Sequence, residues 1–317
     1  MAREPVTWGP DNPHPLSRTK TELVWEGKYD EYGNRRPIRL PTSPLPLQRI
    51  ETIDEPRDRS HAQRLPFEPG RAHRDDFRNL LIWGDNKLAM ASLLEQFRGK
   101  VGLIYIDPPF DVGADFTMDV QLGDAGDEVR KEQSILEAVA YRDTWGKNTD
   151  SYLHMMYERL TLMRDLLAES GSIYVHCDWH VGSYLRLLLD QIFGEQCFLK
   201  ELVWYYYNKM HDIRKPIFPR AHDSILLYCK NRAAERPFTQ LKEKREKPTR
   251  QLIRGKVNGR MVNVRDEEGR VLYRETDERT IDDVWRIPML QPADTTQNTG
   301  FVTQKNELVL SPYSIDG

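Results

Sequence analysis

Two cycles of a short apolar segment and an amphipathic helix constrain the fold of this chain most strongly. The segment 101–106, VGLIYI, is continuously apolar, as strands buried on both faces of a parallel sheet are. A second strand is predicted at 172–177, after a helix within 151–171. That helix carries apolar residues at helical spacing, namely Leu153, Met156, Leu160, Met163 and Leu167. Strands that alternate with helices predict an α/β fold with a parallel sheet.

Helix caps and further apolar segments extend this pattern. Asp85 precedes the periodic segment 86–97 as an expected N-cap, and Gly171 and Gly194 are expected to end the two later helices. Asp178 is expected to cap the helix that ends at Gly194. Further strands are predicted for the apolar segments 79–83, 201–206 and 224–229.

The composition is that of a soluble protein with about two domains. The 317 residues allow two domains at roughly 150 residues each. No apolar run approaches the roughly 18 residues of a membrane helix, and three widely spaced cysteines suit a reducing compartment. We therefore expect a cytoplasmic protein with no membrane contact.

The net charge of −3 hides a strongly basic segment. From residue 200 to residue 260, sixteen lysines and arginines stand against six aspartates and glutamates. Such a surface is a candidate for binding phosphates, and the alternative is a solvated loop. The aromatic run Trp204–Tyr207 suits stacking on unpaired bases as well as a buried strand. The basic residues expected to bind DNA are Lys242, Lys244, Arg245, Lys247 and Arg250.

The strongest local signal for chemistry is the tetrapeptide Asp107, Pro108, Pro109 and Phe110, directly after the segment 101–106. In an open α/β sheet, ligands bind beyond the carboxyl ends of the strands. Two consecutive prolines stiffen the turn and remove two N–H donors. The Asp107 carboxylate and a backbone carbonyl can then accept hydrogen bonds from an exocyclic amine, with Phe110 stacking on the attached base. The alternative is a rigid turn with a capping aspartate.

Several ordered blocks resemble the β-class amino-methyltransferases of DNA, in particular the adenine-specific enzymes related to the modification subunits of type III restriction systems. The resemblance covers roughly residues 20–310. The blocks that carry it lie at 79–94, 102–110, 140–204, 219–231, 282–290 and 299–307. The resemblance implies an α/β fold with a Rossmann-like, S-adenosylmethionine-dependent methyltransferase sheet, incomplete here, and an inserted target-recognition region.

The resemblance also implies a role for each matched residue. Asp107 and the Pro108 carbonyl hold the N6 amine of an adenine that is flipped out of duplex DNA, and Phe110 stacks on its ring. For Asp85 and Asn86 a helix cap is the alternative. The residues implied beside the cofactor S-adenosylmethionine are Asp85, Asn86, Thr303, Gln304 and Lys305.

Four parts are expected along the chain. Residues 1–75 form a proline-rich N-terminal arm, and residues 76–204 form the methyltransferase core with the Asp-Pro-Pro-Phe motif. Residues 205–290 form a basic target-recognition insertion, and residues 291–317 form the start of the cofactor-side block.

The sequence departs from the family pattern in two ways. Val302 and Asn306 replace the prolines that usually flank the Thr-Gln-Lys block, and no Gly-x-Gly occurs in the chain. Because the family places a glycine-rich cofactor block after Thr-Gln-Lys, we expect a chain that is truncated at its C-terminus and does not methylate DNA measurably on its own. The alternative functions are a catalytically silent DNA-binding remnant and an N4-cytosine methyltransferase.

The resemblance implies double-stranded DNA, a second copy of the chain and a restriction (helicase and nuclease) subunit as partners, in the cytoplasm and nucleoid of a prokaryote. No metal site is expected, because His176 is predicted inside a strand and Asp178 as a cap, which leaves His180 alone. The predicted loop that carries Tyr141, Asp143 and Trp145 can close over a flipped base or support the fold.

Overall fold

The structure, a computed structural model, describes most of the chain. The described residues are 10, 21–40, 46–50, 79–109, 118–121, 128–131, 149–210, 216–257, 259–291, 294, 296–299 and 304–310. They belong to two units: Met1–Gly102 with Gly113–Ala168, and Leu103–Val112 with Glu169–Gly317. The predicted loop with Tyr141, Asp143 and Trp145 lies outside the described residues.

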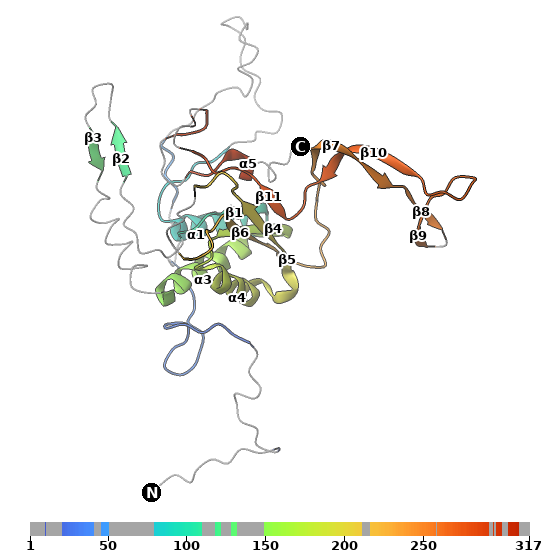
Figure 1. Ribbon diagram of the computed structural model, residues 1–317. Helices are drawn as coiled ribbons and strands as arrows, with labels where there is room; N and C mark the ends of the chain where they lie inside the picture. The colour runs from blue at the N-terminus through green and yellow to red at the C-terminus, as the bar shows by residue number, and fades with distance from the viewer. Residues whose placement is uncertain are drawn as a thin grey trace, which may run out of the picture. The chain divides into compact units, whose positions relative to one another are not determined.

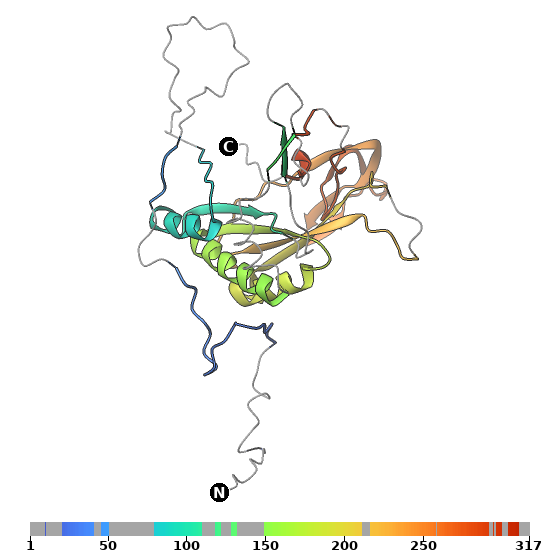
Figure 2. The same ribbon diagram turned by 90° about the vertical axis from the view of Figure 1, so that its left-hand side faces the viewer.

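Helices and strands follow one another as the α/β pattern predicted (Figure 1 and Figure 2). In chain order they are α1 (Asn86–Phe97), β1 (Val101–Ile106), β2 (Met118–Gln121), β3 (Glu128–Lys131), α3 (Thr149–Leu166), β4 (Leu167–Cys177), α4 (Gly182–Phe193), a 3-10 turn (Glu195–Cys197), β5 (Phe198–Tyr205), β6 (His222–Cys229), β7 (Lys242–Leu252), β8 (Arg254–Val257), β9 (Arg260–Asn263), β10 (Tyr273–Thr280), β11 (Val284–Arg286) and α5 (Glu307–Leu310).

In the first unit, α1 packs against α3. Met90 and Leu94 of α1 bury their side chains on Leu162 and Leu166 of α3. The predicted N-cap of α1 is confirmed, because Asp85 accepts hydrogen bonds from the first N–H groups of the helix. The first unit therefore contains a small apolar core of its own between these helices.

Two sequence predictions near these helices are wrong. Helix α3 ends at Leu166 and not before Gly171, because the chain continues as strand β4, in which every second residue from Gly171 to Val175 is buried. The segment 79–83 is not a strand, and Leu81 (99% exposed) and Trp83 (88% exposed) face solvent. Among the described residues no strand pairs with it, because the five-stranded sheet begins at β1.

The central sheet has five strands in the order β1-β4-β6-β5-β11 and is mixed. Strand β6 is antiparallel to both β4 and β5, whereas β11 is parallel to β5. The expectation of a parallel sheet is therefore wrong for β6. The reason is the connection 206–221, which contains no helix among its described residues and returns the chain beside β5 in the opposite direction.

The segment 205–290 does not form one insertion. Strand β6 lies inside the central sheet, between β4 and β5. Within this segment, two-stranded sheets begin only at β7, which pairs with β10, and continue with β8 and β9. Figure 1 shows these four strands as a long arm with β8 and β9 toward its outer end.

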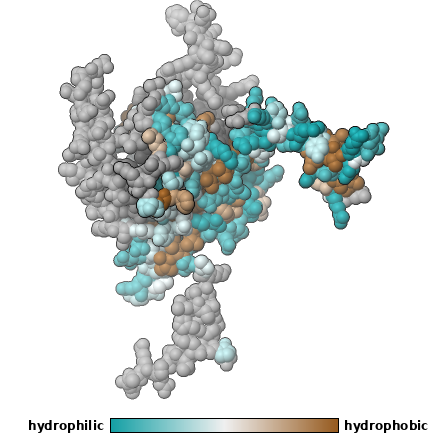
Figure 3. Space-filling model, viewed as in Figure 1, coloured by the Kyte–Doolittle hydropathy of each residue, from teal (hydrophilic) through white to brown (hydrophobic). Residues whose placement is uncertain are grey.

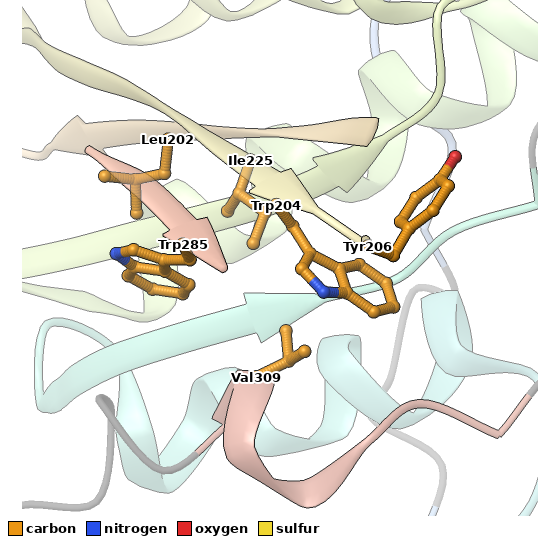
Figure 4. Packing of buried hydrophobic residues seen from close by; sticks show 6 residues of the cluster. All are labelled: Leu202, Trp204, Tyr206, Ile225, Trp285 and Val309. Atoms are coloured by element: carbon orange, nitrogen blue, oxygen red, sulfur yellow. The ribbon is translucent and has the colours of Figure 1, made fainter. Parts of the chain in front are cut away.

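Aromatic side chains fill the core beside β5 (Figure 4). Trp204 and Tyr206 are 3% exposed, whereas Tyr205 (40%) and Tyr207 (56%) alternate toward solvent. Trp204 also donates from Nε1 to the Ile287 carbonyl at 2.8 Å. The cluster comprises Leu202, Trp204, Tyr206, Ile225, Trp285 and Val309. Two of the four aromatics in the run 204–207 are thus core residues and not base-stacking groups.

Helix α4 packs on β6 and ends where predicted. Tyr228 of β6 donates to Asp190 of α4 at 2.6 Å, and Gly194 ends the helix with φ of 97°. The prediction that Asp178 caps α4 is wrong, because the N-cap of this helix is Val181. The Asp178 carboxylate instead accepts the His180 N–H at 2.9 Å in the preceding turn. No described helix is both long enough and apolar enough to span a membrane.

Candidate functional site

Asp107 lies directly after β1, as predicted, and its carboxylate lies beside a lysine and a histidine. Lys305 Nζ lies 2.9 Å from Oδ2, and His176 Nδ1 lies 3.4 Å from Oδ1. The Asp107 side chain is 29% exposed, so that solvent or a ligand still reaches it. Pro108 and Pro109, which follow, are half-buried and carry no N–H. Phe110 lies outside the described residues.

The register of the strands explains why His176 and Asp223 lie close to the Asp107 turn. His176 stands one residue before the end of β4, and Asp223 is the second residue of the antiparallel strand β6. Cys177 pairs with Ser224 across these strands, so the end of β4 and the start of β6 share one edge of the sheet. Asp223 in turn pairs with Trp204 of β5.

His176 is the centre of this group. Its side chain is fully buried, and its Nε2 lies 3.4 Å from Asp223 Oδ2. The Tyr105 hydroxyl lies 3.1 Å from its Nδ1, and the edge of the Trp204 ring packs on the imidazole at 5.6 Å between centroids. The structure thus places His176 between two carboxylates that come from different strands.

The surroundings shift the pKa values of the groups beside His176. Burial raises the pKa of Asp223, but the hydrogen bond and charge of His176 and the charges of Arg220 and Lys305 outweigh it, so the pKa is lowered. Burial, together with Asp107 and Asp223, raises the pKa of the Tyr105 hydroxyl. At neutral pH, Asp223 is therefore an anion and Tyr105 a neutral hydroxyl.

This arrangement is suited to binding a hydrogen-bond donor. An ionised carboxylate only accepts hydrogen bonds, and the Pro108 carbonyl is a second acceptor on the same stiff turn. Two adjacent acceptors match a group with two N–H bonds, such as an exocyclic amine. Among the described residues, no cluster of three or more His, Cys, Asp or Glu side chains is arranged to hold a metal ion.

The predicted cofactor residues near position 304 are committed to other contacts. Lys305 pairs with Asp107, which places it beside the predicted base-binding residue. Gln304 holds its own loop, because Nε2 donates to the Gln297 carbonyl at 2.7 Å and Oε1 accepts the Thr299 N–H at 2.8 Å. Thr303 lies outside the described residues.

Asp85 and Asn86 occupy the start of α1 in the first unit. Asp85 accepts the Lys87 N–H at 2.7 Å, and Asn86 Oδ1 accepts from Arg159 Nε at 2.6 Å. The alternative predicted for Asp85, that it caps a helix, is therefore confirmed. The Asp85 side chain remains 52% exposed, and its cofactor role stays a prediction.

The five residues predicted to bind DNA all lie on β7. Lys242 pairs with Glu278 at 3.0 Å, Arg245 donates to the Glu278 carbonyl, and Arg250 lies over the Tyr273 ring. Figure 3 shows a mostly hydrophilic arm with an apolar patch toward its outer end. Exposed apolar residues on β8 and β9 include Val257, Met261 and Val262.

Sequence reasoning did not assign His176, Asp223 or Tyr105 to the site. One signal was available for the first two, because each is a titratable residue at the edge of a strongly apolar strand segment. Their meeting depends on the position of β6 between β4 and β5, which local pattern does not reveal.

Comparisons with known proteins identify relatives of this chain. The match to the N6_N4_Mtase family model, described as DNA methylase, runs over residues 101–312. The Mod subunit of the type III restriction-modification enzyme EcoP15I from Escherichia coli is 33% identical over 164 residues, which cover 49% of this chain and 24% of that protein. The EcoPI Mod subunit from Escherichia phage P1 is 34% identical over 165 residues, 49% of this chain and 25% of that protein.

The chain thus spans about a quarter of the length of these two relatives. Among solved structures, the M1.HpyAVI–SAM complex has a TM-score of 0.30 and 14% identity over 48% of this chain and 55% of that one. The family match begins at the first residue of β1 and includes Asp107, His176, Asp223 and Lys305. Because it covers more than half of the sequence, the chain belongs to the N6_N4_Mtase family of DNA methylases.

Proposed function

We propose that this chain carries the base-binding side of an S-adenosylmethionine-dependent DNA methyltransferase that modifies the N6 amine of an adenine flipped out of duplex DNA. The observation that carries the proposal is the place of Asp107. Its carboxylate follows β1 directly, lies between Lys305 and His176, and is followed by two prolines without N–H donors.

In this proposal the amine donates one hydrogen to Asp107 and the other to the Pro108 carbonyl. With both hydrogens held, the nitrogen lone pair points out of the plane of the base and toward the methyl donor. The contribution of these residues is therefore positioning. Flipping the base costs a few kcal/mol, which the hydrogen bonds and stacking on Phe110 offset.

S-adenosylmethionine supplies an electrophilic methyl group when it is bound. The half-exposed Asp85 carboxylate at the start of α1 fits the ammonium group of such a donor. Gln304 and Lys305 fit the donor less well, since Gln304 holds its own loop and Lys305 pairs with Asp107. We therefore assign Lys305 to the base-binding side.

The arm from β7 to β10 is the proposed DNA-contacting and target-recognition part. Its first strand carries Lys242, Lys244, Arg245, Lys247 and Arg250, whose charges suit contacts to phosphates. A restriction subunit and a second copy of this chain are the proposed protein partners, because the relatives named above are Mod subunits of restriction-modification enzymes. The proposed location is the cytoplasm, at the nucleoid.

The test is transfer of labelled methyl groups from S-adenosylmethionine to unmethylated genomic DNA by the chain extended with the glycine-rich cofactor block of a family member, followed by analysis of the modified nucleosides. We expect label in N6-methyladenine with the wild type and none above background with Asp107→Asn, while both bind DNA equally. Asn keeps the size of the side chain but replaces one acceptor oxygen by a donor. Label in N4-methylcytosine, or equal label from both proteins, would overturn the assignment.

A further inference from the structure

His176 is a buried, titratable residue that the proposed chemistry has not used. Its side chain is 0% exposed, and each of its ring nitrogens faces a carboxylate. Nδ1 lies 3.4 Å from Asp107 Oδ1, and Nε2 lies 3.4 Å from Asp223 Oδ2. Burying such a group costs stability unless it is paired, so the pairing at this edge of the sheet calls for an explanation.

Groups from three neighbouring strands face the imidazole. Strand β1 contributes the Tyr105 hydroxyl, 3.1 Å from Nδ1, and β1 is followed by Asp107. Strand β6 contributes Asp223, and β5 contributes the edge of the Trp204 ring. Two cations act on the same carboxylates, because Lys305 pairs with Asp107 and both Lys305 and Arg220 lower the pKa of Asp223.

The two protonation states of the ring differ in what they offer Asp107. An imidazolium carries an N–H on each nitrogen and donates to both carboxylates at once. A neutral ring has one N–H, so that one carboxylate faces an unprotonated nitrogen. A carboxylate at one nitrogen also fixes the orientation of the ring, and Asp223 at Nε2 therefore directs Nδ1 at Asp107.

We propose that His176 is a positioning residue for Asp107. Oriented by Asp223 and the Tyr105 hydroxyl, its ring packs Nδ1 against Oδ1 of the Asp107 carboxylate while Lys305 holds Oδ2, so that the carboxylate meets the target amine in one orientation. The inference rests on the proposed function, in which Asp107 receives that amine. A misplacement of about 1 Å costs on the order of 100-fold in rate, which sets the expected size of the effect.

Three substitutions distinguish the contributions of the two ring nitrogens of His176. His176→Asn keeps a polar group near the position of Nδ1, His176→Gln keeps one near Nε2, and His176→Phe keeps the ring but neither nitrogen. We expect kcat to fall about 10- to 100-fold in the Gln and Phe variants and less in the Asn variant, with KM for DNA unchanged. The matched control is His180→Gln, which removes a half-exposed histidine that is also paired with an aspartate, Asp178.

A second measurement does not depend on methyl transfer. In the purified chain without DNA, NMR reports the His176 ring nitrogens and the titration of the Asp223 carboxyl. We expect the His176 nitrogen signals to shift in Asp107→Asn and in Asp223→Asn. We also expect the pKa of Asp223 to rise in His176→Phe, since the hydrogen bond from His176 lowers it, and to stay unchanged in His180→Gln.

The two measurements distinguish a failure of this inference from a failure of the proposed function. Two results would overturn the role of His176. One is that the His176 nitrogen signals do not shift in Asp107→Asn, and the other is a folded His176→Phe variant with wild-type kcat. An extended chain with all wild-type residues that transfers no methyl group contradicts the proposed function instead. In that case the response of the His176 signals to Asp107→Asn still decides whether His176 positions the carboxylate.

Discussion

Lys305 donates to the Asp107 carboxylate across 2.9 Å, although one residue lies in the last described segment and the other in the turn after β1. An amine that binds Asp107 therefore shares the carboxylate with Lys305. The contact makes Lys305 part of the surroundings of the target base, and it ties the segment 304–310 to the edge of the central sheet.

Replacing Lys305 tests this ion pair. We expect Lys305→Met to lower kcat for methyl transfer by about tenfold, which corresponds to about 1.4 kcal/mol, because Oδ2 of Asp107 loses its charged partner. DNA affinity should change little, since the pair is mostly shielded from solvent. Lys305→Arg keeps the charge and should retain most of the activity. A rate that is equal in the Met variant and the wild type would show that the pair is dispensable.

The basic strand β7 should supply much of the DNA affinity. Replacing Lys242, Lys244, Arg245 and Lys247 with Gln should weaken binding and flatten its dependence on salt, by about 0.9 in the logarithmic slope for each phosphate that is no longer neutralised. The control exchanges the same lysines for Arg and Arg245 for Lys, which keeps the charge and should keep the slope. Fluorescence anisotropy over a salt series measures both. An unchanged slope in the Gln variant would show that other residues bind the phosphates.

Asp223 should make stability depend on pH in the acidic range. Its pKa in the folded protein is lowered from 3.8, so its ionised form stabilises the fold fully above about pH 4. That contribution is lost as the pH falls through the lower folded value. In urea unfolding, the stability difference between wild type and Asp223→Asn should therefore be largest near neutral pH and shrink below about pH 4. A difference that grows on acidification would contradict this sign.

Adjacent aromatic residues on β5 should respond very differently to truncation. Trp204 is 3% exposed and Tyr205 is 40% exposed. Trp204→Ala should lower the free energy of unfolding by roughly 3–5 kcal/mol, because it opens a cavity in the cluster of Figure 4. Tyr205→Ala should cost less than about 1 kcal/mol. Chemical denaturation of both variants measures the contrast, and equal losses would contradict the alternating burial.

Local patterns in the sequence determined the elements that depend on neighbouring residues. The apolar run 101–106 forms β1, Asp85 caps α1, and Gly194 ends α4. In each case the signal is a period or a cap that acts over a few positions along the chain. The Asp107 turn was found for the same reason, since an aspartate and two prolines directly after a buried strand form a local motif.

Tertiary structure decided the end of α3, the place of β6 and the partners of Asp107. Helix α3 stops at Leu166 because the chain from Leu167 enters the central sheet as β4. Strand β6 enters the sheet antiparallel between β4 and β5, which brings Asp223 to His176. His176, Asp223 and Lys305 are far apart along the chain, and no local period relates them. Their meeting at Asp107 follows from the direction in which each strand returns to the sheet, which depends on packing among all of the strands together.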